Sequence, residues 1–363
     1  MEVISNRQAK LLGIMLAMDG MLVSLPNKVF KLAARDAWMA YLLAFPVVLI
    51  LLWMLTKTTA RFPGKSLFQI MVLRRPVIGR ILALPVQLFL FLVILRDVRT
   101  LSEFVNIELL AYTPVPVISG LIVLSIVVTV NSRFEVVARM IEIWLPLTLA
   151  FIALIPVLLY PEFEIRHTLP MLEKGFGPVL QGSWYTIAAM GQILLLPFLL
   201  PSSQFGMRDG LYSLVITSVM MQWLNLCALL SMGSVIASKL QYPFHEMVRL
   251  IRVTDFLDRF ELPLDMIYIP LMITKMAFFL YAFMFGMERI VPALHMDKLL
   301  LSFGACCFTF SFWFFRNAAQ LFNFTRTLSI LALMLEVVLT GLLFVLLRPK
   351  QQAPPKSSAP GKT

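Results

Sequence analysis

The chain is dominated by long apolar runs of about 20 residues each, separated by short polar stretches. The hydrocarbon core of a bilayer is about 30 Å thick, and a helix needs roughly 20 mostly apolar residues to cross it. Helices satisfy every backbone polar group within the segment, as lipid requires, and the alternating pattern of barrel strands is absent from the sequence. We therefore predict an all-α integral membrane protein with about ten transmembrane helices. The expected spans are residues 11–29, 38–56, 81–101, 115–131, 143–160, 179–200, 211–237, 264–286, 298–315 and 328–348.

Charged residues make up only 14% of the 363 residues. A soluble domain carries about 25% charged residues, so lipid must form part of the solvent of this chain. No polar stretch between the spans is long enough to hold a separate soluble domain. We predict one transmembrane domain over residues 1–348 and a disordered cytoplasmic tail over residues 349–363, which are rich in Pro, Lys, Gln and Ser.

The net charge of +11 indicates contact with membrane lipids rather than with nucleic acid, because no basic patch with interleaved aromatic residues lies on a soluble face. Cations are most frequent in residues 57–80 and in the tail. Lys and Arg are enriched in cytoplasmic loops, so this distribution favours cytoplasmic N- and C-termini.

Two connections have the composition of amphipathic helices. Residues 57–80 mix apolar and cationic side chains, which is typical of a helix lying at the membrane interface. Residues 243–262 have apolar residues at roughly helical spacing, with charge on the opposite face. We expect the second connection to form a helical element on the outer face.

The first and sixth spans contain residues that interrupt helices. In the first span these are Gly13, Asp19, Gly20, Ser24 and Pro26, and in the sixth they are Gly191, Gln192, Pro197 and Pro201. Proline removes a backbone donor and clashes with the preceding turn, and freed backbone at membrane depth is tolerated only where protein or a cavity surrounds it. Corresponding breaks in two halves of a chain point to a transporter-type site at the midplane. The alternative is that these residues merely kink two membrane helices.

Several charged residues fall within or beside the spans. A carboxylate at mid-span costs roughly 2.5–3.5 kcal/mol on insertion scales, so Asp19 needs a partner or hydration, and we expect it to pair with Lys275 of the eighth span. Glu336 of the tenth span lies in a cavity or in a helix contact. Near the end of the third span, Arg96, Asp97, Arg99 and Glu103 form either a solvated helix end or the rim of a substrate vestibule.

No catalytic or metal-binding motif stands out. The three histidines lie in different loops, the three cysteines lie in apolar runs, and the sequence contains no HExxH, GxSxG or P-loop pattern. We expect neither an enzyme nor a bound cofactor or metal.

Short motifs in a fixed order run from residue 4 to residue 346. They are Ile4-Ser5 with Gln8, Asp36-Ala37-Trp38, Arg61-Phe62-Pro63-Gly64-Lys65-Ser66-Leu67, Leu95-Arg96 with Ser102-Glu103, Tyr112-Thr113-Pro114, Phe134-Glu135-Val136-Val137-Ala138-Arg139, Tyr242-Pro243 with Glu246 and Arg249, and Phe256-Leu257-Asp258-Arg259-Phe260-Glu261. Through their order and spacing the chain resembles the B subunit of bacterial spore germinant receptors, the spore germination permease family of the amino acid/polyamine/organocation superfamily.

The resemblance implies a LeuT-like fold of two inverted five-helix repeats, here about residues 11–160 and 179–348, with helices 1 and 6 discontinuous around a ligand site. It also implies sensing of a small-molecule germinant (an amino acid, amine, sugar or nucleoside) together with A and C subunits at the inner spore membrane. From the breaks and the buried charges we expect ligand-binding residues at Asp19, Gly20, Ser24, Gly191, Gln192, Lys275 and Glu103.

Two residues depart from the family pattern. Asp19 would repel the carboxylate of an amino acid and attract its ammonium group, and Lys275 takes the place where sodium-coupled relatives hold an ion. Two other functions stay open: an amino-acid or amine permease, and a structural membrane subunit without a ligand. Uptake of labelled substrate into vesicles separates a permease from a receptor.

Overall fold

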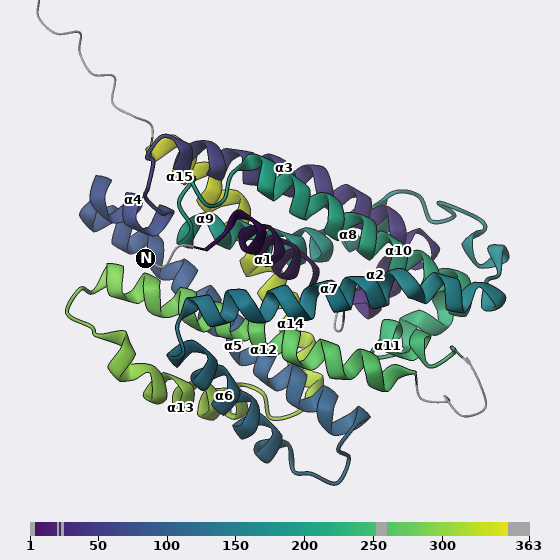
Figure 1. The fold of residues 1–363 in the computed structure, drawn as a ribbon. Coiled ribbons are helices and arrows are strands. Elements are labelled where there is room, and N and C mark those ends of the chain that lie inside the picture. The colour runs from purple at the N-terminus through teal and green to yellow at the C-terminus, as the bar shows by residue number, and fades with distance from the viewer. Residues whose placement is uncertain (1–3, 20–21, 23–24, 252–259, 348–363) are drawn as a thin grey trace, which may run out of the picture.

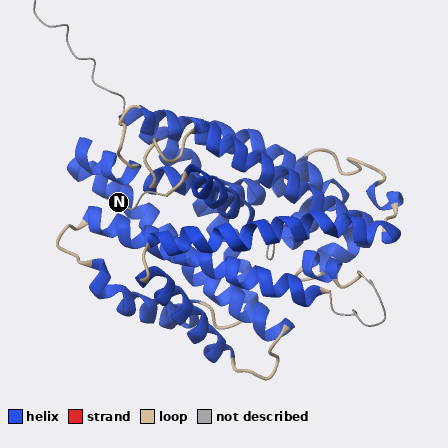
Figure 2. Ribbon diagram, viewed as in Figure 1, coloured by secondary structure: helices blue, strands red, loops and turns tan. Residues whose placement is uncertain are grey.

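A computed structural model of the protein describes residues 4–19, 22, 25–251 and 260–347, with the side chains of Asp19, Met296 and Asp297 also outside the description. Within this part the chain is helical and contains no strand (Figures 1 and 2). The α-helices are α1 (Asn6–Asp19), α2 (Leu25–Ala33), α3 (Ala37–Ala60), α4 (Leu67–Arg74), α5 (Pro76–Glu108), α6 (Val115–Asn131), α7 (Phe134–Leu159), α8 (Gly177–Met190), α9 (Leu196–Leu199), α10 (Met207–Lys239), α11 (Pro243–Val248), α12 (Glu261–Ile290), α13 (Met296–Phe314), α14 (Ala318–Leu333) and α15 (Thr340–Leu346). Shorter turns are η1 (Ala34–Asp36), η2 (Tyr160–Glu162), η3 (Ile165–Thr168), η4 (Gly191–Leu195) and the π-helix η5 (Met334–Leu339).

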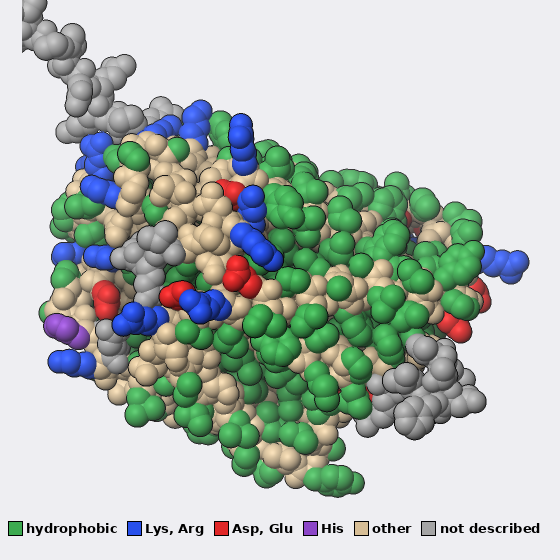
Figure 3. Space-filling model, viewed as in Figure 1, with side chains coloured by type: hydrophobic (Ala, Val, Ile, Leu, Met, Phe, Trp, Pro, Cys, Tyr) green, Lys and Arg blue, Asp and Glu red, His purple; other side chains and the backbone are tan. Residues whose placement is uncertain are grey.

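Seven helical segments of the described chain are long and apolar enough to cross a membrane. They contain seven of the predicted spans. The predicted spans 115–131 and 298–315 correspond to shorter apolar helices, and the first span is divided between α1 and α2. In Figure 3 hydrophobic side chains cover the flank of the molecule, and Lys and Arg gather at the end that holds α4 in Figure 1. The protein is therefore an integral membrane protein.

The centre of the molecule is made by helices that are far apart in sequence. Helix α3 packs against α8, α1 against α10, and α5 against α12, while α6 and α13 lie together at one side (Figure 1). The contacts of α1 with α10 and of α8 with α3 hold the two interrupted regions, α1–α2 and α8–η4–α9, inside the bundle.

Local sequence signals explain where two of the helices begin. At the start of α1, the Ser5 backbone N–H donates to the Gln8 side chain (2.9 Å) and the Gln8 backbone N–H donates to the Ser5 hydroxyl (3.2 Å). This reciprocal pair of hydrogen bonds is a capping box. The Ser66 backbone likewise donates to the Gln69 side chain (3.1 Å) at the start of α4, which buries Leu67, Phe68, Ile70 and Met71. The helix predicted within residues 57–80 is thus confirmed. That predicted over 243–262 is found only as α11, and residues 252–259 lie outside the described part.

Both predicted interruptions are present. Helix α1 ends at Asp19 and α2 begins at Leu25, and the sixth span changes from α-helix to 3₁₀ geometry at Gly191 before α9 begins. The last span contains a further irregularity that the sequence did not predict, the π-helix η5 between α14 and α15. Single π turns inside α-helices are frequent at functional sites.

Candidate functional site

A cavity lies where the second half of the broken first span meets α5, α8, η4 and α14. Its polar or charged wall residues are Arg96, Tyr185, Gln192, Thr325 and Ser329, and the remaining wall is formed by Leu25, Phe89, Val93, Ala188, Ala189, Leu328 and Ala332. The space open to water-sized molecules is about 20 Å³, roughly enough for one water molecule. The site is therefore closed, and a ligand of amino-acid size requires the surrounding helices to separate.

One wall of this cavity is backed by a buried network of charges. The Arg96 Nε donates to Asp97 Oδ1 at 2.7 Å, and Lys275 Nζ of α12 lies 3.1 Å from Asp97 Oδ2. All three side chains are at most 9% exposed. The network joins α5 to α12 beside the cavity and leaves the Arg96 side chain on its wall.

The structure corrects the interpretation of this cluster as a solvated helix end. Helix α5 continues to Glu108, beyond the predicted end at residue 101, and the cluster lies buried within it. Opposite charges on the same helix and on α12 compensate one another, so the helix carries them through an apolar environment.

Of the predicted ligand residues, Gln192 lies on the cavity wall and Gly191 begins the 3₁₀ turn beside it. Lys275 is fully buried against Asp97 rather than on the described wall. Glu103 is bound by Arg99 at 2.6 Å and is also absent from the described wall. The structure therefore brings Gln192 to the cavity wall with Gly191 next to it in the chain, and places Lys275 and Glu103 in buried ion pairs.

The break in the first span holds the remaining predicted residues. Gly20 and Ser24, and the side chain of Asp19, lie outside the described part of the chain. The backbone places Asp19 at the last position of α1, at the entrance to the break. The expected Asp19–Lys275 pair thus stays a prediction, alongside the Asp97 partner that the structure gives to Lys275.

A second cavity adjoins the first, since Phe89 and Gln192 line both. Its wall includes Gly191 and Glu336, the latter on the π-helix η5. A Cβ atom added at Gly191 would lie only 2.1 Å from the carboxyl carbon of Glu336. The Glu336 carboxyl of the last span thus lies directly against the Gly191 backbone of the sixth, and Glu336 belongs to a cavity.

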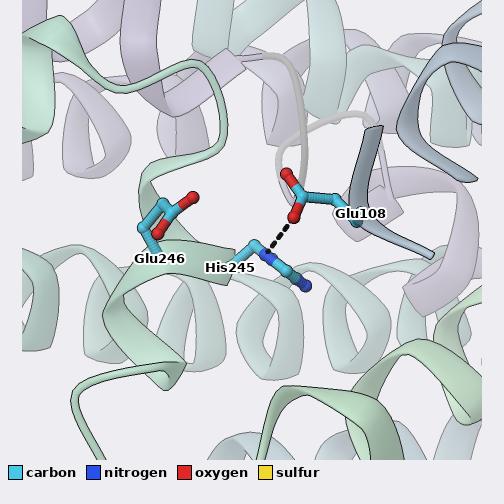
Figure 4. A group of neighbouring side chains, drawn as sticks. All are labelled: Glu108, His245 and Glu246. Atoms are coloured by element: carbon cyan, nitrogen blue, oxygen red, sulfur yellow. Dashed lines mark ion pairs between the residues drawn. The ribbon is translucent and has the colours of Figure 1, made fainter. Parts of the chain in front are cut away.

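At the C-terminal end of α5, a cluster of charged residues joins α11 to α5 and α12. Nε2 of His245 lies 3.2 Å from Asp265, and Nδ1 lies 3.8 Å from Glu108. Figure 4 shows Glu108 and Glu246 on either side of His245, with ligand atoms of all three within 4.8 Å of one another. Such a group could hold a metal ion, but Arg249 already binds Glu108 at 2.6 Å and Glu246 at 3.1 Å.

Arg249 is held firmly in its charged form. Burial would lower its pKa, but Glu108, Glu246 and Glu261 offset this and raise the pKa above its ordinary value. A cavity under the cluster, lined by His245, Asp265 and Phe104, extends to Leu22 in the break of the first span. The cluster thus borders a cavity that reaches the interrupted first span.

We predict that Arg249→Met lowers the free energy of unfolding by about 1–3 kcal/mol, because the buried carboxylate of Glu108 loses its main partner. Thermal unfolding of the purified protein in detergent measures the effect. Arg139→Met is the matched control, since its ion pair with Glu135 is exposed on both sides (69% and 53%) and should contribute at most about 1 kcal/mol. Equal effects of the two substitutions would contradict the role given to Arg249.

Two features of the site were not predicted from the sequence. Asp97 was identified only as a member of a charge cluster, and its pairing with Lys275 depends on the packing of α5 against α12. The burial of His245 with Asp265 was missed because both residues lie near predicted loops. Helical spacing along 243–248 was the one signal that could have placed His245 on a packed face.

The comparisons with known proteins agree in the family and the fold. The sequence profile described as "Spore germination protein" matches residues 3–319. The putative spore germination protein YfkT of Bacillus subtilis is 25% identical over 325 residues, covering 90% of each chain. Spore germination protein KB of the same organism is 24% identical over 316 residues, covering 83% of this chain and 82% of its own.

Among solved structures, the fold is similar to that of Mhp1, a transporter of the nucleobase-cation-symport-1 family, in a closed conformation with bromovinylhydantoin bound. The TM-score is 0.62 with 15% sequence identity, and the match covers 93% of this chain and 77% of Mhp1. The chain thus has the fold of this transporter.

Proposed function

Because the chain belongs to the spore germination protein family, we propose that it is the germinant-sensing membrane subunit of a spore germination receptor. It binds a small molecule in the central cavity and passes the signal to partner subunits. The observation that carries the proposal is the position of this cavity, which lies between the broken first span and the 3₁₀ turn of the sixth.

The wall of the cavity supports recognition of a small polar molecule. Arg96 supplies a positive charge, Gln192 an amide and Tyr185 a phenol, while Phe89 and Val93 supply apolar contact. The backbone at an interrupted helix offers further amides and carbonyls. Asp19 stays in the proposed site because it ends α1 at the break, where a cationic ammonium group would be attracted.

The proposed arrangement is the LeuT-like one, with ten spans in two inverted repeats. Its support is the pairing of helices across the bundle: the first span packs on α10 through α1, and the sixth packs on α3 through α8. Helix α3 is the second span and α10 the seventh. Exchanging the two five-span halves therefore converts the contact between the first and seventh spans into the contact between the sixth and second spans. The cationic end in Figure 3, which holds α4, would face the cytoplasm together with both termini.

The proposed setting follows from the family. The chain would lie in the inner spore membrane with A and C subunits and respond to an amino acid, an amine, a sugar or a nucleoside. Binding transmits a signal only if the ligand has different affinities for two conformations. The closed cavity is one such conformation, and opening to admit the ligand requires a second.

A permease is the second candidate, favoured by the transporter fold of the structural neighbour. Uptake distinguishes the two functions. Reconstituted vesicles that bind a labelled ligand without accumulating it support the receptor, whereas accumulation that saturates with ligand concentration supports the permease.

We predict that a true ligand raises the unfolding temperature of the purified protein and that Ala189→Phe abolishes this effect, because the new ring fills the cavity. A ligand at 100 times its Kd stabilises by about 2.7 kcal/mol. Ala305→Phe is the control, because Ala305 is exposed on α13. Gln192→Met provides a second variant of similar volume should Ala189→Phe unfold. A ligand whose effect survives both cavity variants binds elsewhere, which would contradict the proposal.

A further inference from the structure

Glu336 is a buried carboxyl group inside the membrane-spanning bundle. Its residue is 7% exposed, and it lies on the π-helix η5, which directs the carboxyl against Gly191 of the sixth span. The contact is direct, because an added Cβ atom at Gly191 would overlap the carboxyl oxygens at 2.2 Å. The carboxyl therefore touches the irregular turn η4 itself.

The surroundings of Glu336 supply no cation among the described residues. It is the only charged residue on the described wall of its cavity, which is otherwise apolar apart from Gln192 and Thr340. Neither η4 nor α15 contains a charged residue. On the neighbouring α5, Arg96 faces the other cavity and binds Asp97, and on α14 Arg326 lines a separate cavity.

Two hydrogen-bond acceptors on this wall have no partner. Oε2 of Glu336 and Oε1 of Gln192 are both buried without a hydrogen bond within the described structure. Two acceptors in one cavity require a donor between them, since a buried polar group without a hydrogen bond costs about 1–3 kcal/mol. An isolated ionised carboxylate in such a place costs far more free energy, so the carboxyl group must bind a proton or another cation.

We propose that Glu336 is a proton-binding site, and that in this closed arrangement its carboxyl is protonated and donates to the Gln192 side chain. One proton neutralises the carboxylate and serves both unpaired acceptors. The space open to water-sized molecules is about 30 Å³, so water can reach the group when the cavity opens and accept the proton.

Release of this proton would change the contact with the sixth span. An ionised carboxylate requires a hydration shell, and the cavity at Glu336, with about 30 Å³ open to water-sized molecules, has room for only about one water molecule. Ionisation therefore favours separation of η5 from η4, and protonation favours their contact. Glu336 thereby couples the proton concentration to the same break that lines the central cavity.

Infrared spectroscopy of the purified protein tests the proposal directly. We expect a carbonyl band of a protonated carboxyl at neutral pH, sensitive to exchange into D₂O, that is lost in Glu336→Gln and retained in Glu135→Gln, where the carboxyl is 53% exposed. If Glu336→Gln is unstable, Glu336→Asp assigns the band instead, because this variant keeps a carboxyl group and should shift the band rather than remove it. No band assigned to residue 336, or a signal that responds to sodium or methylammonium and not to pH, would overturn the proposal.

Thermal unfolding gives an independent readout. A group that keeps its proton when folded and loses it when unfolded makes stability fall as pH rises above about 4.3, the ordinary value for Glu. We expect the wild-type unfolding temperature to decrease from pH 5 to pH 8 relative to that of Glu336→Gln. Parallel pH profiles would contradict a bound proton. Neither measurement uses a germinant, so their outcome is separate from that of the proposed function.

Discussion

Replacing Asp97 by Asn should lower the free energy of unfolding by about 3–5 kcal/mol, the cost of leaving buried charge without a partner. The substitution leaves Arg96 and Lys275 as neighbouring cations in the bundle, both buried and both deprived of the carboxylate that they share. Lys275→Met should also destabilise, because Asp97 then keeps only Arg96. Thermal unfolding in detergent, together with the amount of protein in the membrane, measures both effects.

The double variant Asp97→Asn/Lys275→Met separates the ion pair from general disturbance of the core. Residues in one network are not additive, so the double variant should lose less stability than the two single variants together. Lys10→Met is the control, since its pair with Asp209 is 3.5 Å long and partly exposed, and should contribute at most about 1 kcal/mol. Strict additivity, or an Asp97→Asn effect as small as the control, would contradict the network.

Replacing Gly191 by Ala should abolish ligand binding and lower stability by about 1–3 kcal/mol, the usual cost of inserting atoms into a packed core. The reason is the 2.1 Å approach of an added Cβ atom to the Glu336 carboxyl, which must then leave its position against η4. The measurement is binding of the ligand identified by thermal shift, compared between the wild type and Gly191→Ala.

Two variants make this prediction specific. Glu336→Ala removes the carboxyl that the new methyl group would meet, so Gly191→Ala/Glu336→Ala should be less destabilised than the two single effects added together. Gly182→Ala is a matched control on α8, because its Cβ would be 3.4 Å from its nearest neighbours, an ordinary contact. Gly182→Ala should keep ligand binding. Wild-type binding in Gly191→Ala would remove the contact from the mechanism.

The sequence predicted the elements whose causes are local. Apolar runs located the long helices, and Gly191 marked the change of geometry in the sixth span. Each of these depends on a few neighbouring residues and on the thickness of the bilayer. The break after Asp19 was predicted for the same reason.

Contacts between distant spans could not be predicted in this way. The partner that the structure gives to Lys275 comes from the α5–α12 contact, and Asp97 was one of several carboxylates that could have met it. The π-helix that aims Glu336 at Gly191 depends on how α14 and α15 pack, and no residue of Met334–Leu339 indicates it. Charge inside a span predicted that a partner is needed, whereas the identity of the partner required the three-dimensional structure.

The most direct test of the central cavity is germination of spores that carry this chain as their only B subunit, exposed to amino acids, amines, sugars and nucleosides. Three forms are compared: the wild type, Ala189→Phe with a filled cavity, and Ala305→Phe with the same change on an exposed position. We expect the wild type and Ala305→Phe to respond to one class of germinant, and Ala189→Phe to lose the response at normal protein level. An undiminished response in Ala189→Phe would contradict it, because the germinant would then be sensed somewhere other than the cavity between the two interrupted spans.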